Sequence, residues 1–284
     1  MSKFENKIDF AVLVSVQNAN PNGDPLNGNR PRTDYNGFGE ISDVAVKRKI
    51  RNRMQDMGQR VFVQSDDRSD DGAKSLSDRA KNVEGLTKIE HRDEFARIAC
   101  QEWIDVRTFG QVFAFPKGLN VKSVGVRGPV SIHQAVSKDP VEVFSMQITK
   151  SVSGDKKEGQ ERGSDTMGWK HFVRFGLYEI KGSINVQLAE KTGFSKEDAE
   201  IVKDCLCSLF VNDASAARPD GSMEVVRVFW WEHNCKDGQY SSAKVHRSLN
   251  VSLKEGVVLP SSADDYDIRL DELDGLKCTV MEGM

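Results

Sequence analysis

The clearest chemical pattern in the sequence is a run of cations in a predicted helix. Residues 44–60 contain six lysines and arginines against a single aspartate. Lys47 and Arg51 are four positions apart, so a helix places them one turn apart on one face, where they can contact successive phosphates. The helix is predicted to begin at Ser42, and the free backbone N–H groups of a helix start attract anions. The alternative interpretation is a solvated basic helix face.

The loop before this helix, residues 17–40, is rich in asparagine, glycine and proline, a composition typical of turns and exposed backbone. A loop of this length is usually functional. It carries Arg30 and Arg32, which favour a binding role for the basic helix. It also carries Asp24 and Asp34, which could hold a metal ion but in a turn-rich loop more often cap turns.

The other candidate contacts lie farther along the chain. The segment Arg107-Thr-Phe-Gly-Gln111 combines a cation, an aromatic ring and a glycine, which suits a splayed single strand, although such a segment is more often a core turn. Lys122, Arg127 and His133 form a looser polar cluster. Lys150 and Met167 lie on or beside a polar arm at residues 151–167, whose apolar residue could wedge between bases.

No constellation for catalysis or metal binding stands out. The five histidines are dispersed, and the phosphate-binding, nucleophile-elbow and zinc-protease motifs are missing from the sequence. The five cysteines include no C-x-x-C pair, so neither a zinc site nor a disulfide framework is indicated. We therefore expect a protein that is not an enzyme and that needs no metal or cofactor.

Composition is compatible with a folded, nucleic-acid-binding chain. The hydrophobic content of 38% is adequate for a large core, and the first apolar run ends by Val16, too short for a signal peptide or a membrane span. We expect a cytoplasmic protein. The net charge of -3 argues weakly against a nucleic-acid partner, but residues 261–284 hold seven acids and two bases, so the acidic charge is concentrated at the far end.

The elements that must position these residues follow from periodicity and capping signals. The prediction is a strand, a helix ending at Gly58, two strands around a Lys181-Gly182 turn, a helix opening at Ser195 and a last strand. In residue numbers the elements are 8–16, 42–58, 172–180, 183–188, 195–210 and 223–231. This β-α-β-β-α-β order predicts an α+β, ferredoxin-like fold related to RNA-recognition motifs. The long stretch between the first helix and the strand pair is predicted to be an α/β insertion, with a helix at 92–104 and strands at 111–115 and 121–126.

Several longer motifs carry a resemblance to a known family. They are Asn18-Ala-Asn-Pro-Asn-Gly-Asp-Pro25, Asn29-Arg-Pro-Arg32, Ile41-Ser-Asp-Val-Ala-Val-Lys-Arg-Lys-Ile-Arg-Asn52, Arg107-Thr-Phe-Gly-Gln-Val-Phe113, Gly128-Pro-Val-Ser-Ile132 and Asn212-Asp-Ala-Ser-Ala-Ala-Arg218. With them the sequence resembles the CRISPR-associated backbone subunit of type I-B and I-C effector complexes, a branch of the RAMP superfamily, and type I-C is favoured.

The resemblance implies a single right-hand-shaped domain. Its palm would comprise residues 8–58 and 171–232, its fingers and thumb residues 60–170, and a C-terminal segment with an acidic tail residues 233–284. Copies would stack head to tail on a crRNA as a helical filament within an antiviral Cascade complex. Target DNA would be recognised through the guide, and other Cascade subunits and a helicase-nuclease would be further partners, with no membrane involved.

Motif positions and residue chemistry together give the expected RNA contacts. They are Asn20, Asn22, Arg30, Arg32, Ser42, Lys47, Arg48, Arg51, Arg107, Phe109, Gln111, Lys122, Arg127, His133, Lys150 and Met167. Two alternatives stay open. The first is a metal-dependent target-RNA ribonuclease of the type III kind, using Asp34 or Asp24. The second is a guide-processing ribonuclease, for which the sequence offers no assembled histidine or tyrosine set.

Overall fold

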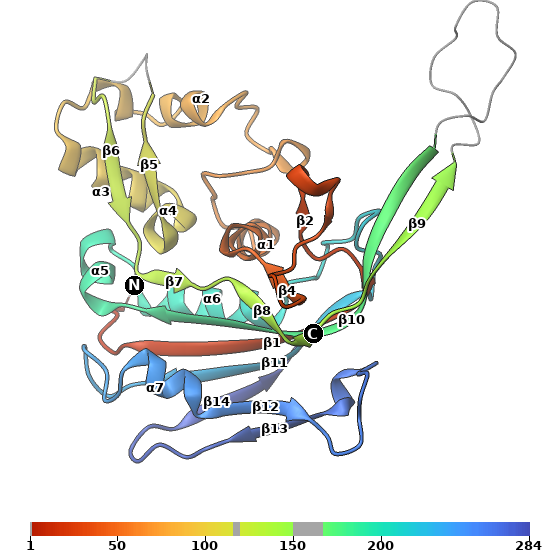
Figure 1. Ribbon diagram of the computed structural model, residues 1–284. Helices are drawn as coiled ribbons and strands as arrows, with labels where there is room; N and C mark the ends of the chain where they lie inside the picture. The colour runs from red at the N-terminus through yellow and green to blue at the C-terminus, as the bar shows by residue number, and fades with distance from the viewer. Residues whose placement is uncertain (1, 116–119, 150–166) are drawn as a thin grey trace, which may run out of the picture.

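The computed structural model describes residues 2–115, 120–149 and 167–284. A large antiparallel sheet lies at its centre, with helices on one face and a C-terminal layer on the other (Figure 1). A lobe of helices and two short strands, residues 60–115 and 120–127, stands beside the helical face and is called the helical lobe below. These features confirm the predicted mixture of helices with an antiparallel sheet. Within the described residues, no helix has both the length and the apolar composition needed to cross a membrane.

The central sheet draws its strands from most of the chain. Its members are β1 (Ile8–Ala19), β4 (Phe38–Ile41), β7 (Val130–Ile132), β8 (Ala135–Pro140), β9 (Val143–Thr149), β10 (Met167–Ile184), β11 (Met223–Glu232) and β14 (Cys278–Glu282). The main strand order is β14-β11-β1-β10-β8-β4, with β7, β8 and β9 pairing with successive parts of β10. Beyond the sheet, β9 and β10 continue as a projecting two-stranded ribbon (Figure 1).

Strand β1 lies between two hydrophobic cores and contributes side chains to both. Phe10 and Val12 point into the core beneath the helices, whereas Ala11 and Leu13 point into the core beneath the C-terminal layer. Successive side chains of a strand face opposite sides, so a strand covered on both faces needs a continuous apolar run. This explains why residues 8–16 are clearly recognisable as a strand in the sequence, and the structure extends that strand to Ala19.

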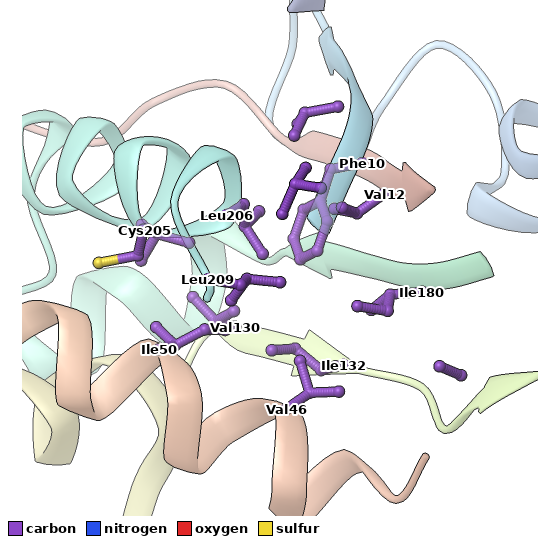
Figure 2. Packing of buried hydrophobic residues seen from close by; sticks show 14 of the residues in the cluster. Phe10, Val12, Val46, Ile50, Val130, Ile132, Ile180, Cys205, Leu206 and Leu209 are labelled. Carbon is purple, nitrogen blue, oxygen red and sulfur yellow. The ribbon is translucent and has the colours of Figure 1, made fainter. Parts of the chain in front are cut away.

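The helical face is formed by α1 (Asp43–Asp56), α5 (Val186–Thr192) and α6 (Lys196–Cys207). The two longer helices begin where the sequence predicts. Ser42 caps α1, and Ser195 forms a capping box with Asp198 at the start of α6. Figure 2 shows the resulting packing, in which Val46 of α1 lies beside Ile132, Ile50 of α1 lies near Leu209, and Leu206 at the end of α6 lies toward Phe10 of the sheet.

The predicted turn at Lys181-Gly182 is wrong. Both residues lie inside the 18-residue strand β10, and the chain then enters α5 after Asn185, whose side chain accepts a hydrogen bond from the backbone N–H of Leu188 (2.8 Å). Gly182 has an ordinary strand conformation, and a Cβ at this position would overlap the ring of Phe10. The glycine is therefore required for close packing. On one side β10 pairs with β1, and on the other its partners are β7, β8 and β9, which fall within the predicted insertion.

The helical lobe has a hydrophobic core of its own, built around Phe62, Phe95, Trp103 and Phe113. Its elements are α2 (Leu76–Lys81), α3 (Arg92–Glu102), α4 (Ile104–Phe109), β5 (Gly110–Phe113) and β6 (Val124–Arg127), with short 3-10 turns η2 (Asp66–Arg68) and η3 (Leu86–Lys88). The predicted helix at 92–104 and the two predicted strands are confirmed. Helix α4 joins the two cores, because Ile104 packs into the main core and Val106 into the lobe.

The remaining elements flank the sheet. The loop between β1 and β4 contains the short strands β2 (Gly23–Asp24) and β3 (Arg30–Pro31), separated by the 3-10 turn η1 (Pro25–Asn27). The C-terminal layer consists of α7 (Ser242–Arg247), β12 (Leu249–Leu253), β13 (Tyr266–Leu270) and the 3-10 turn η4 (Ala263–Asp265). This layer packs on the face of the sheet opposite α1.

Candidate nucleic-acid interface

The start of α1 is tied to the loop before it. The hydroxyl oxygen of Ser42 accepts a hydrogen bond from the backbone N–H of Ala45 (3.3 Å), and the backbone N–H of Ser42 donates to Oδ1 of Asn22 (2.9 Å). Both residues are predicted RNA contacts. In this structure they hold the loop against the helix, which places the loop beside the cations of α1.

Arg51 is held by two groups from α4. Its Nε donates to Oδ2 of Asp105 (2.9 Å), and its guanidinium carbon lies 5.1 Å from the centre of the Phe109 ring, a cation–π contact. Arg51 and Phe109, both predicted from the sequence, are therefore brought together. Asp105 was missed, because nothing in the sequence marks an acid 54 positions away as the partner of Arg51.

Arg48 lies one turn before Arg51, beside the same carboxylate. Its Nη1 donates to the backbone carbonyl of Val63 (3.0 Å), and among the described residues it has no carboxylate within ion-pair distance. Partial burial lowers the pKa of the Arg48 guanidinium, and the positive charge of Arg51 lowers it further. Two guanidinium groups thus share the carboxylate of Asp105, and Asp67 acts on Arg48 only from beyond ion-pair distance, so the positive charge of the pair is incompletely compensated. Such a site favours an anion.

The two lysines of α1 form ion pairs with acids of the same protein. Lys47 forms an ion pair with Asp43 one turn earlier (2.9 Å), so its charge is less available than the sequence implies. Lys49, which is not among the predicted RNA contacts, is buried and forms an ion pair with Asp213. The structure therefore shifts the emphasis from Lys47 with Arg51 to Arg48 with Arg51. Lys47 remains a predicted contact.

The loop residues divide into internal and outward-facing groups. Asn20 is buried, and its side-chain amide donates to the backbone carbonyl of Asn29 (2.7 Å), so we withdraw it from the predicted RNA contacts and assign it to the support of the loop. Arg32 lies 3.6 Å from Asp24, a partly exposed ion pair. Arg30 is half-buried on β3 and has no ion pair among the described residues.

The two acids proposed for metal chemistry act as turn caps. Oδ1 of Asp24 accepts the backbone N–H of Leu26 (3.1 Å), and Oδ1 of Asp34 accepts those of Asn36 (2.8 Å) and Phe38 (2.9 Å). Within the part of the chain that the structure describes, no group of three or more His, Cys, Asp or Glu side chains could hold a metal ion.

Arg107 is a correction to the predicted site. It is buried, with Nη2 and Nε donating to the two carboxylate oxygens of Asp198 (2.8 and 3.0 Å) and Nη1 donating to the carbonyl of Cys100 (3.2 Å). A bidentate ion pair inside the domain engages one edge of the guanidinium with Asp198 rather than with an external anion. We therefore assign Arg107 a structural role between α4 and α6 and withdraw it from the RNA contacts.

The other predicted contacts are not gathered around α1. Gln111 donates to the carbonyl of its neighbour Val112 (3.1 Å), and Lys122 and Arg127 are exposed on the helical lobe. His133 follows β7 with its ring 6.0 Å from that of His246 on α7, so it lies on the opposite face of the sheet. Lys150 lies outside the described residues, as does most of the predicted polar arm, and the structure does not describe the side chain of Met167.

Comparisons with known proteins agree on one family. The family model of CRISPR-associated protein Cas7 matches residues 6–271. The chain belongs to the Cas7 family. A Cas7 protein of Haloferax volcanii is 27% identical over 246 residues, which cover 81% of this chain and 72% of that protein.

Solved structures extend the Cas7 comparison to the fold. A chain from a "CRISPR RNA-guided surveillance complex, pre-nicking" matches 89% of this chain and 84% of its own length, with a TM-score of 0.52 and 17% identity. A chain from another CRISPR RNA-guided surveillance complex matches 89% and 78% of the two chains, with a TM-score of 0.48 and 18% identity. The first match shows that this Cas7 chain shares its fold with a subunit of such a complex.

Proposed function

We propose that this chain is a guide-binding backbone subunit of a type I-C Cascade complex. It binds crRNA without sequence preference, and copies of it polymerise head to tail along the guide. The observation that carries the proposal is the pair Arg48 and Arg51 on α1, of which only Arg51 forms an ion pair among the described residues, with Asp105. Lysine and arginine contacts to phosphates position a strand but read no bases, as a backbone protein requires.

The fold supports a right-hand architecture. The strand order β11-β1-β10-β8, with α1 after β1 and α6 between β10 and β11, is the order of a ferredoxin-like palm. We assign the fingers to the helical lobe and the thumb to the β9–β10 ribbon together with residues 150–166, which lie outside the described residues. In this proposal the other partners are target DNA paired to the guide, the remaining Cascade subunits and a helicase-nuclease, all in the cytoplasm.

The proposed role is non-catalytic. Asp24 and Asp34 use carboxylate oxygens to cap turns, which favours the structural interpretation over metal-dependent RNA cleavage. The assembled complex, incubated with guide, complementary RNA and Mg²⁺, should leave both strands intact. Regularly spaced cuts that disappear in Asp34→Ala would instead establish the ribonuclease alternative.

Salt-dependent binding tests the interface. Arg51→Ala should weaken binding to every short RNA alike and reduce the log–log salt slope by about 0.7, the contribution of one phosphate contact on a single strand. Arg97→Ala is the matched control, because Arg97 is an exposed arginine on α3 that contacts Gln101. Gel filtration with full-length guide should show RNA-dependent growth to a defined large particle. A monomer that ignores RNA would contradict the proposal.

A further inference from the structure

We propose that Asp105 is a positioning residue that sets both Arg48 and Arg51 for one backbone phosphate of the guide RNA. The inference rests on the proposed function, and it assigns a role to a buried acid that does not itself contact the RNA. An acid beside a nucleic-acid site is ordinarily unfavourable because it repels phosphates. The contacts of Asp105 show how this carboxylate can favour binding.

The carboxylate of Asp105 is almost fully buried, with 1% of the side chain exposed, and it accepts three hydrogen bonds. Oδ1 accepts the backbone N–H of Phe62 (2.7 Å). Oδ2 accepts the backbone N–H of Val63 (3.1 Å) and Nε of Arg51 (2.9 Å). Three donors on a buried carboxylate hold it in one orientation, and it therefore provides a fixed reference point for both arginines.

The contact with Arg51 leaves two terminal nitrogens for a second anion, on a side chain that is 12% exposed. Asp105 engages only Nε, and among the described residues no hydrogen bond uses Nη1 or Nη2 of Arg51. The Phe109 ring, 5.1 Å away, supports the guanidinium from one side. The two terminal nitrogens of a guanidinium match two oxygens of a phosphate. Arg51 can thus bind Asp105 and a phosphate at once, which a lysine with its single ammonium group cannot do with the same geometry.

Asp105 also orients Arg48, through the backbone of Val63. The N–H of Val63 donates to Asp105, and the carbonyl of Val63 accepts from Nη1 of Arg48 (3.0 Å). The same carboxylate therefore determines the position of the peptide that holds Arg48. Arg48, Arg51 and Asp105 together carry one positive charge, and Asp67 attracts Arg48 only from beyond ion-pair distance. A phosphodiester carries one negative charge and can compensate it.

The helix that carries Asp105 is itself held firmly. Ile104 packs into the main core and Val106 into the core of the helical lobe. On the far side of α4, Arg107 pairs with Asp198 at the start of α6. Asp105 is thus part of a rigid support, and the arginines, which lie on a different helix, are oriented by it.

The test separates positioning from simple charge. If Asp105 acted only as a nearby negative charge, Asp105→Asn would make the site more positive and strengthen binding to a short single-stranded RNA. Positioning predicts the reverse, a loss of about tenfold, because charge-assisted hydrogen bonds are no longer aligned. In an Arg48→Ala/Arg51→Ala background, Asp105→Asn should have no further effect on affinity. Asp93→Asn, which removes an exposed acid of α3, is the control and should leave binding unchanged.

A second variant leaves Asp105 intact and therefore does not depend on the folding of Asp105→Asn. Arg51→Lys keeps the charge, but its ammonium should be engaged by Asp105, so we expect RNA binding nearly as weak as in Arg51→Ala. Wild-type affinity in Arg51→Lys, or tighter binding in Asp105→Asn, would overturn the inference. If Arg48→Ala and Arg51→Ala bound RNA like wild type, the proposed interface itself would fail, a result distinct from failure of the positioning role.

Discussion

Because Arg107 is buried, replacing it should lower the stability of the fold and leave RNA affinity unchanged, whereas replacing Arg51 should weaken RNA binding. Arg107→Ala removes both hydrogen bonds from Arg107 to the buried carboxylate of Asp198. Among the described residues, that carboxylate would then keep only the backbone N–H and hydroxyl of Ser195 as donors. Breaking a buried ion pair by removing one partner costs about 3–5 kcal/mol. In a chain of this size that corresponds to a fall in Tm of roughly 10 °C.

Circular dichroism on heating and urea unfolding would measure the loss of stability. RNA affinity would be measured by fluorescence anisotropy at a temperature where the variant is folded, and both the affinity and the salt slope should equal those of the wild type. The double variant Arg107→Met/Asp198→Asn is the matched control. It should be less destabilised than the sum of the single changes, because no charge is left buried without a partner.

The opposite pattern would refute this reasoning. If Arg107→Ala melted like the wild type and flattened the salt slope by about 0.7, Arg107 would be a phosphate contact, as its sequence context suggests. Arg107 would then not be paired with Asp198, and the inference on Asp105 would lose the support that α4 gives it.

Two further predictions follow from the sheet. Gly182→Ala should cost about 1–3 kcal/mol of unfolding free energy, because the added methyl overlaps the ring of Phe10, whereas Gly125→Ala, with open space around it, should cost little; equal melting temperatures would contradict the packing role. Burial opposes ionisation of Asp9, but hydrogen bonds from His233 and Lys7 outweigh it and hold the pKa of that carboxyl below its ordinary value. A carboxyl whose pKa is lowered in the folded state stabilises the protein above its unfolded pKa, here about 4, and this contribution is lost as pH falls. The free energy of unfolding, measured with urea at a series of pH values, should therefore fall less steeply toward acid pH in Asp9→Asn than in the wild type.

Local signals explain which elements could be predicted from the sequence. Ser42 and Ser195 are helix caps whose hydrogen bonds close within three residues, and both helices begin where expected. The misassigned segment around Gly182 depends on a residue far away in sequence. A Lys-Gly pair between apolar runs is typical of a turn. The ring of Phe10 and the backbone carbonyl of Ser131, on the two neighbouring strands, show why a glycine is needed inside β10.

The functional site exposes a similar limit, since local net charge does not say which cations are free. The basic run from residue 44 to residue 60 contains six cations, and most are paired with acids that the structure brings near: Lys47 with Asp43, Lys49 with Asp213, Arg53 with Asp56, and Arg60 with Glu102.

Arg51 also has an acid partner, Asp105, but shares its surroundings with Arg48, which among the described residues has no carboxylate of its own. Among the described residues, this strongly basic segment thus leaves one charge, that of Arg48, without an ion pair, and it lies beside Arg51. Because that charge lies where two guanidinium groups are already oriented, a phosphate can bind there with little rearrangement, and the electrostatic and geometric requirements of a backbone contact are met by the same three residues.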